Sequence, residues 1–325
     1  MEYVIRRIGF YALAAWASLT LNFLLPRMMP GNPGDALAAQ MQGRVPPETL
    51  AAMAQAYGIS DDPIWRQYIS YIGNVFRGEL GVSISAFPAP VSEVIQTALG
   101  WTLLVGGVSV VVAFIVGTSL GMVAAWRRGS WLDSVLPPFL QLFGSFPYFW
   151  VAMLALFFLG LQWGVFPLRH SYSNDLSPEF SLAFFSSVGY HLVMPAGTII
   201  VVALGGWVLS MRNSMISTLS EDYVMMAEAK GLSQRRVMFS YAARNAMLPN
   251  LTQFGMALGF VIGGSLITEI VFAYPGLGYQ LITAVRRLDY PLMQGIFLLI
   301  TMAVLAANLI VDLLYVRLDP RVRRG

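Results

Sequence analysis

The sequence contains no cysteine, a single lysine and two histidines, and charged residues make up only 11% of its 325 positions. The lack of cysteine excludes disulfides, thiolate metal sites and cysteine nucleophiles. The two histidines, His170 and His191, have no distinctive partner nearby in the sequence, so neither a histidine-rich metal site nor a Ser-His-Asp arrangement is indicated. We therefore expect no catalytic residue, no metal site and no cofactor.

The scarcity of charge excludes an ordinary soluble domain, in which charged residues make up about a quarter of the chain. Hydrophobic residues account instead for 57% of the sequence, together with 30 glycines and 17 methionines. This composition is typical of a helical protein that crosses a membrane several times. The pI of 9.2 is compatible with nucleic-acid binding, but the net charge is only +3. A bias of arginine toward cytoplasmic loops explains the pI better, so we expect no nucleic-acid partner.

The single lysine also excludes a nucleotide-hydrolysing motor. A Walker A motif requires a lysine directly after the second glycine, followed by Ser or Thr. Lys230 instead precedes Gly231, so the chain has no such motif. We predict that the chain is not an enzyme, and that another subunit would have to supply any ATP hydrolysis.

Six apolar segments are long enough to cross a bilayer, and they cover about residues 8–26, 98–126, 136–161, 192–211, 251–272 and 292–315. A cleaved signal peptide is the alternative interpretation of the first segment. Its uncharged run is longer than the 7 to 15 residues of a signal-peptide core, which favours an uncleaved span. The sequence thus predicts an all-α polytopic membrane protein with six transmembrane helices.

The distribution of charge predicts the orientation of these spans. With the N-terminus inside, most of the 20 Lys and Arg residues fall in cytoplasmic segments and most acidic residues fall outside. This is the positive-inside pattern, and an even number of spans then places both termini in the cytoplasm. We expect a multi-pass protein of the cell (inner) membrane.

A more polar stretch separates the first two predicted spans. It contains PGNPGD, a helix-like VPPETLAAMAQAYGI and DDPIWRQYISYIGNVFRGELG, which predict two or three short helices outside the membrane. The stretch is too small for a core of its own, so we expect it to pack on the outer ends of the spans. The predicted organisation is an N-terminal transmembrane helix (1–29), an extracytoplasmic helical insertion (30–95) and a transmembrane core (96–325). Residues 273–291 are too short and too charged to cross, and should lie at the outer surface.

The core contains a predicted cytoplasmic loop, residues 213–250, with a polar island from Ser220 to Pro249. Ser220 can cap a first helix and Gly231 can end it. Ser233 can cap a second helix, which Pro249 is expected to break. One interpretation is an ordinary solvated loop; the other is a helix–turn–helix shape that docks into a cleft on another protein.

The pattern AEAKGLS, followed by a long helix ending in LP, resembles the coupling motif of ABC-importer permeases. Arg235, Arg236 and the pair Arg244-Asn245 before Leu248-Pro249 resemble the dipeptide/oligopeptide branch. The runs PGNPGD, TEIVFAYPGLGY and NLIVDLLYVRLDPRVR are similar to the same family, so the resemblance covers nearly the whole chain. It implies the type I ABC importer permease architecture.

The resemblance implies a set of ATPase-coupling residues on this island. They are Glu221, Asp222, Tyr223, Ala227, Glu228, Ala229, Lys230, Gly231, Leu232 and Ser233. The small residues Ala227, Ala229 and Gly231 would allow close packing with the partner. The general motif begins Glu-Ala-Ala, whereas this chain reads Met225-Met226-Ala227, so the salt-bridge role of that initial Glu does not carry over.

The resemblance also implies partners: a second homologous permease subunit, two ABC ATPase subunits, an extracytoplasmic solute-binding protein and the membrane lipid. The expected function is to form half of the translocation pathway for di- and oligopeptides. Relatives carry short oligosaccharides, nickel chelates or glutathione, and the sequence does not decide between peptide and oligosaccharide. It makes direct nickel ligation improbable, because histidine is scarce and cysteine is absent.

Two other function classes compete with this interpretation. A proton-coupled secondary transporter needs titratable groups at mid-membrane. Asp312 lies near the end of the sixth segment, where we expect an ion pair with Arg317, and Glu269 can pair with Arg286 or Arg287 or touch a cationic substrate group. A structural membrane scaffold would not need the helix–Gly–helix island. The aromatic cluster at 143–150 and the glycine pairs at 205–206 and 263–264 are expected to serve mainly helix packing.

Overall fold

The computed structural model describes the backbone of residues 2–30 and 62–318, and the side chains of residues 6–30 and 62–310 except 264. Within these ranges the regular secondary structure is helical, with one isolated β-bridge between Val82 and Pro90 and no strand. The expected all-α fold is therefore confirmed. The predicted motif PGNPGD, the helix-like stretch at 45–59 and the side chains of Asp312 and Arg317 lie outside the described residues.

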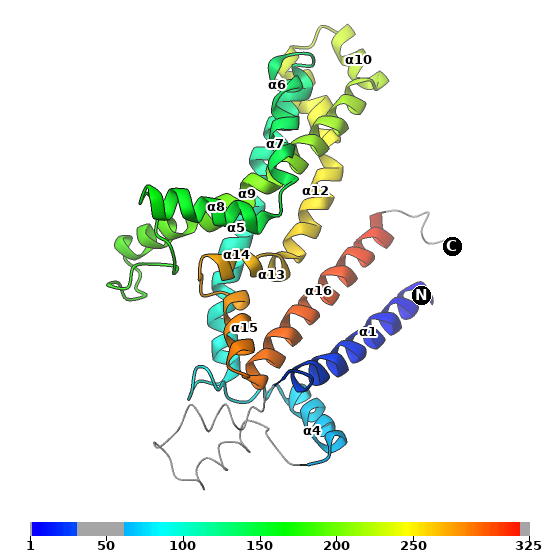
Figure 1. The fold of residues 1–325 in the computed structure, drawn as a ribbon. Coiled ribbons are helices and arrows are strands. Elements are labelled where there is room, and N and C mark those ends of the chain that lie inside the picture. Colours follow the sequence, from blue (N-terminus) through cyan, green and yellow to red (C-terminus); the bar gives the residue numbers. More distant parts are fainter. Residues whose placement is uncertain (1, 31–61, 319–325) are drawn as a thin grey trace. The chain divides into compact units, whose positions relative to one another are not determined.

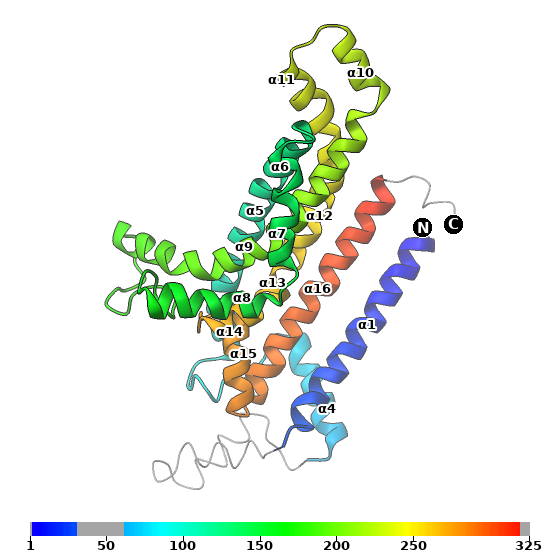
Figure 2. The same ribbon diagram turned by 45° about the horizontal axis from the view of Figure 1, so that its top comes forward.

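The chain divides into two compact units, of which the first comprises Met1–Thr102 and Pro275–Gly325. It contains α1 (Glu2–Arg27), α4 (Ile64–Arg77), the first part of α5 (Val91–Trp126), α15 (Leu277–Arg286) and α16 (Tyr290–Leu318). Helices α1 and α16 pack side by side, and α4 lies against the C-terminal end of α1 (Figures 1 and 2). The start of α1 and the end of α16 lie at the same end of this unit.

The fully buried carboxylate of Asp289 holds the connection into α16. One of its oxygens accepts hydrogen bonds from the Ser83 hydroxyl (2.6 Å) and from the backbone N–H of Ser85 (2.8 Å), and the other accepts from the Leu292 N–H (3.1 Å). Asp289 thus satisfies the Leu292 N–H at the start of α16 and ties that turn to the segment that precedes α5.

The second unit, Leu103–Tyr274, holds the rest of the helices. They are the remainder of α5, α6 (Trp131–Ser134), α7 (Leu136–Gly144), α8 (Tyr148–Ala155), η1 (Leu156–Gln162), α9 (Leu182–Leu219), α10 (Asp222–Ala229), α11 (Gln234–Arg236), η2 (Val237–Ala243), α12 (Arg244–Gly259), α13 (Val261–Gly264) and α14 (Leu266–Val271). Helix α9 contacts α7, α8 and α12. A Cβ built on Gly205 would lie 2.8 Å from backbone atoms of Gln141, so glycine here permits the close approach of α7 and α9, in line with its expected packing role.

Four helical stretches in the described residues are long and apolar enough to span a membrane: Arg6–Arg27, Val91–Trp126, Leu182–Leu219 and Tyr290–Ile310. Two bent pairs, Trp131–Gly144 with Tyr148–Gln162 and Gln234–Gly259 with Val261–Val271, bring the total to six if each pair is one span. Up to six spans agree with the predicted polytopic architecture. Helix α15 is short, as expected for the stretch 273–291.

The third predicted span is not one straight helix. Its two halves meet at 92°, with the break at Ser145, Phe146 and Pro147. A proline disfavours helical geometry in the residue before it. Pro147 itself has a ψ of 123°, outside the helical region, and α8 begins directly after it. The fourth predicted span was too short, because α9 continues on both sides of it and keeps Pro195 inside the helix.

Candidate functional site

The helical hairpin formed by residues 220–249 lies at one tip of the second unit, at the end of the α9–α12 helix pair (Figures 1 and 2). Helix α9 ends at Leu219, and α10 (Asp222–Ala229) follows after a two-residue turn. The chain then reverses and enters α11, η2 and α12 without interruption. The sequence therefore predicted the helix–turn–helix shape correctly.

The start of α10 differs from the prediction that Ser220 caps it. Ser220 instead closes α9, and its hydroxyl donates to the Ser217 carbonyl at 2.7 Å. Glu221 occupies the cap position, in extended geometry and with no side-chain hydrogen bond, while Asp222 lies in the first turn as expected. The reason is that α9 runs on to Leu219, so Ser220 is used for the last turn of one helix rather than the first turn of the next.

The turn after α10 depends on Gly231. Its φ of 72° is in the left-handed region, where residues with a Cβ are disfavoured, so its predicted role as helix terminator is confirmed. The Gly231 N–H donates to the Glu228 carbonyl at 2.8 Å, and the Leu232 N–H donates to the Ala227 carbonyl at 3.3 Å. These two bonds form a Schellman motif, which satisfies the last carbonyls of α10 and gives the turn a defined shape.

The inner face of α10 packs on the returning helix. Val224 and Ala227, one helical turn apart, are buried against Val237, and Leu232 and Tyr241 close the same cluster. Contact of Leu232 with the last turn of α10 is the apolar interaction that usually accompanies a Schellman motif. The hairpin is therefore held by its own small core.

A polar contact ties the two arms together on the outside. The side-chain amide nitrogen of Asn245, at the start of α12, donates to the hydroxyl of Tyr223 at 2.8 Å and to the Tyr241 carbonyl at 3.3 Å. Sequence reasoning selected Tyr223 but gave no role to its hydroxyl. The contact spans the hairpin, so only the folded chain brings the two residues together.

The returning helix contradicts the expectation that Pro249 ends it. Ser233 occupies the cap position of α11, although its side chain makes no cap hydrogen bond, and Pro249 lies inside α12, which continues to Gly259. A proline removes one helical N–H, a loss that neighbouring helices in a membrane protein can offset. Here the inner face of this run is well packed: Met238, Ala242 and Ala246 are buried against Met211 and Met215 of α9.

The outer face of the hairpin carries most of the predicted coupling residues. Those exposed are Glu221, Asp222, Tyr223, Glu228, Ala229, Lys230, Gly231 and Ser233, whereas Leu232 is half-buried. Ala227 is only 2% exposed, so it packs within the hairpin and does not offer the outward contact expected of it. The sequence did not identify Met225 and Met226, which are 50% and 58% exposed. The one-turn spacing of Val224 and Ala227 was the signal that could have shown these methionines to face outward.

A partly buried ion pair joins α6 to α9 in the same unit. Arg212 of α9 donates from Nε to a carboxylate oxygen of Asp133 at 2.5 Å, and the other oxygen accepts the Gly129 N–H at 2.9 Å. The Asp133 side chain is 6% exposed and that of Arg212 is 24% exposed. The pair fastens the α5–α6 connection to α9. Sequence reasoning missed it because the two residues are far apart in the chain.

Among the described residues no group of three or more His, Asp or Glu side chains is placed to hold a metal ion. The His191 ring lies 2.8 Å from the Ser187 carbonyl of its own helix. Glu269 is fully buried and accepts a hydrogen bond from Ser265 at 2.7 Å, and Arg287 donates to the Ser85 carbonyl. The two alternatives for Glu269 therefore stay predictions.

The chain is similar to known transport proteins over nearly its whole length. Residues 117–324 match the family model described as "Binding-protein-dependent transport system inner membrane component". The chain is 34% identical over 340 residues to the dipeptide transport system permease protein DppB of Escherichia coli (strain K12), covering 99% of both chains. It is 32% identical to the di/tripeptide transport system permease protein DppB of Pseudomonas aeruginosa (strain UCBPP-PA14), again over 99% of both.

A third relative is the oligopeptide transport system permease protein AppB of Bacillus subtilis (strain 168), 32% identical over 98% of both chains. The matched family region contains the whole hairpin, and the full-length matches extend the similarity to α1 and α4. The chain therefore belongs to the family of binding-protein-dependent transport system inner membrane components, and it is a multi-pass permease.

Proposed function

We propose that the chain is one transmembrane subunit of an ATP-binding-cassette importer for di- or oligopeptides, and that the hairpin is the part gripped by an ATPase subunit. The observation that carries the proposal is the outward surface of α10. Tyr223, Met225 and Met226 present apolar area there beside the charges of Glu228 and Lys230, on a hairpin held by its own core. An exposed, mixed surface on a well-defined element is suited to docking in a cleft.

The connections of α10 support a mechanical role. It joins α9 through a two-residue turn and packs on η2, which continues directly into α12. A force on α10 would therefore reach two long helices at once. In the proposed cycle, ATP binding closes a pair of ATPase subunits. The cleft of one ATPase subunit then displaces the hairpin of this chain. The spans tilt in response and open the pathway toward a solute-binding protein. Differences in binding free energy between the two states would drive the switch.

The names of the relatives support peptides over oligosaccharides as the substrate, since all three concern di-, tri- or oligopeptides. We also propose the assembly of this chain with a second homologous permease, two ATPase subunits and a solute-binding protein. The shared end of α1 and α16 in the first unit supports the proposal that both termini lie in the cytoplasm. A proton-coupled transporter is the less favoured alternative.

Gly231→Arg tests the docking role, with Gly78→Arg as a matched control. Both glycines end a helix with positive φ (72° and 75°), both are exposed, and neither has a neighbouring atom where a Cβ would lie. The two substitutions therefore carry the same backbone strain, roughly 1–2 kcal/mol.

In proteoliposomes with the partner subunits, we expect Gly231→Arg to abolish ATP-dependent peptide uptake and Gly78→Arg to retain it, with both proteins inserted in the membrane. Equal uptake by the two variants would refute the docking role of the turn. Uptake that is unaffected by the absence of ATPase subunits would favour the secondary transporter.

A further inference from the structure

Helix α4 (Ile64–Arg77) turns its most apolar side away from the rest of its unit. Trp65, Ile69, Ile72 and Phe76 recur at helical spacing on one face. Trp65 is 59%, Ile69 63% and Phe76 81% exposed, and no residue of α4 is fully buried. A helix of a soluble domain would place such a stripe in the core, so this stripe calls for an apolar neighbour beyond the residues that the structure describes.

A second face of α4 is fixed to the last turns of α1 by polar contacts. The hydroxyls of Tyr68 and Thr20 lie 2.8 Å apart, and Asn22 donates to the Tyr71 hydroxyl at 3.2 Å. Arg27 donates to the Gln67 side chain at 3.1 and 3.2 Å. These contacts set the rotation of α4 about its axis, so the direction of the apolar stripe is determined.

The same contacts set the level of α4 along α1. Thr20 precedes Arg27 by two helical turns, about 10 Å along the axis at roughly 1.5 Å per residue. Thr20 lies well inside the apolar run Arg6–Arg27, which is long enough to span a membrane. Helix α4 therefore contacts α1 within the last turns of its membrane-spanning run, at the level of the membrane boundary, and not beyond the end of α1.

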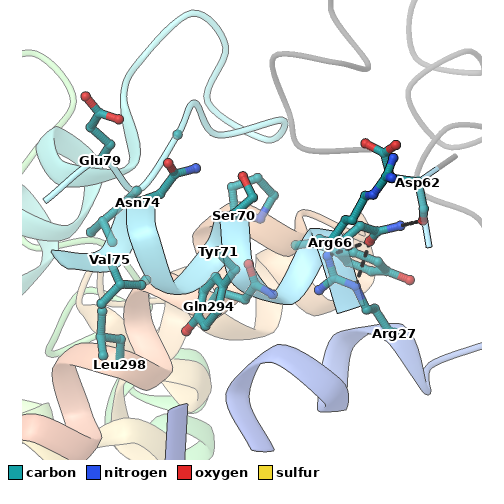
Figure 3. A pocket seen from close by; sticks show the side chains of 16 residues that line it. Arg27, Asp62, Arg66, Ser70, Tyr71, Asn74, Val75, Glu79, Gln294 and Leu298 are labelled. Carbon is teal, nitrogen blue, oxygen red and sulfur yellow. Dashed lines mark hydrogen bonds between the residues drawn. The ribbon is translucent and has the colours of Figure 1, made fainter. Parts of the chain in front are cut away.

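A third face of α4 is polar and open. Arg66, Ser70 and Asn74 lie along it and border a cavity of about 320 Å³. Figure 3 shows Ser70 and Asn74 on the side of α4 away from Tyr71, which points toward Gln294 of α16, while Arg66 lies near Asp62. Helix α4 thus has a protein-facing, an apolar and a polar side, which is the arrangement expected of a helix where protein, lipid and water meet.

We infer that α4 lies in the membrane boundary at the Arg27 end of α1, with Trp65, Ile69 and Phe76 in the lipid of that leaflet and the half-buried Ile72 at its edge. Amphipathic helices of this kind bury their apolar face about 5–10 Å into the headgroup and acyl region. Trp65 suits this level, because its ring is amphipathic, and Arg66 and Arg77, at the two ends of α4, can reach the headgroups. The inference requires only that α1 spans the membrane, so it stands apart from the docking role of the hairpin.

Single nitroxide labels can test this placement, because the chain has no native cysteine that would compete for the label. Ile69→Cys and Phe76→Cys report the apolar side, and Ser70→Cys, an exposed residue on the polar side, is the matched control. The labelled permease is assembled with its partner subunits in phospholipid vesicles. Collision rates with oxygen, which concentrates in lipid, and with a water-soluble nickel chelate are then measured.

We expect the ratio of oxygen to nickel collisions to be several-fold higher at positions 69 and 76 than at position 70. A low ratio at all three positions would place the stripe in water and overturn the inference. Labels at 69 and 76 that are shielded from both reagents would assign the stripe to a protein partner and would also overturn it. As a second measurement, brominated phospholipids should quench a larger fraction of the tryptophan fluorescence in the wild type than in Trp65→Phe. Equal fractional quenching in the two proteins would place Trp65 away from the lipid.

Discussion

The hydroxyl of Tyr223 accepts a hydrogen bond from the side-chain amide of Asn245 across the hairpin, at a distance of 2.8 Å. This contact joins α10, the proposed docking element, to the start of α12. If the hairpin moves as one body, this contact contributes to its stiffness.

Tyr223→Phe should therefore weaken the coupling of ATP hydrolysis to uptake while leaving assembly intact. The hydrogen bond is exposed, so we expect its loss to remove about 1 kcal/mol of hairpin stability. Peptide uptake per ATP hydrolysed is the measurement, in a double-mutant cycle with Asn245→Ala. The double mutant should lose no more than either single mutant; additive losses would show that the two residues act independently.

Ala229→Cys should cross-link to a cysteine in the cleft of the ATPase partner, because Ala229 is exposed at the end of α10. Ala227→Cys provides a control on the same helix, since Ala227 is 2% exposed and faces Val237. Cross-linking is read by gel mobility after mild oxidation. Equal yields at the two positions would contradict the assignment of the outer face.

Met226→Glu should reduce uptake without unfolding the chain. The side chain is 58% exposed, and substitutions at such positions usually change stability by less than about 0.5 kcal/mol. A charge in an apolar contact that costs about 1.4 kcal/mol lowers the affinity for the ATPase tenfold. Binding of the ATPase to the purified permease is the measurement. Met226→Leu keeps the apolar volume and should bind the ATPase with normal affinity. If Met226→Leu loses as much affinity as Met226→Glu, the contact is not an apolar one.

Asp133→Ala should destabilise the second unit, because it leaves the Arg212 guanidinium and the Gly129 N–H without their acceptor. We expect a loss of about 2 kcal/mol in the free energy of unfolding, below the value for a fully buried pair because Arg212 is 24% exposed. The thermal denaturation midpoint in detergent reports it.

The exchange Asp133→Arg with Arg212→Asp should recover only part of this stability, since the reversed pair cannot accept the Gly129 N–H. Arg127→Ala, at an exposed arginine of the same connection, should leave the midpoint unchanged. A midpoint for Asp133→Ala equal to that of the wild type would argue against a structural role for the ion pair.

Features that depend on composition or on a few neighbouring residues can be predicted from the sequence alone. Long uncharged runs specify membrane helices because a charge in lipid is costly. Gly231 specifies the end of α10 because its backbone must adopt a positive φ. Ser220 and Pro249 show the limit of such local signals: each is suited to a helix boundary, but the extent of α9 and α12 decided where the boundaries lie.

Which side of each helix is exposed depends on how the helices pack in the folded chain. Ala227 and Met226 are adjacent in the sequence, yet one is buried and the other exposed, because Val237 returns to cover one face of α10. The ion pair of Asp133 with Arg212 and the outward stripe of α4 likewise depend on residues that are distant in the chain. The direction in which a side chain faces follows from helix packing, and packing depends on contacts between residues that are far apart in the sequence.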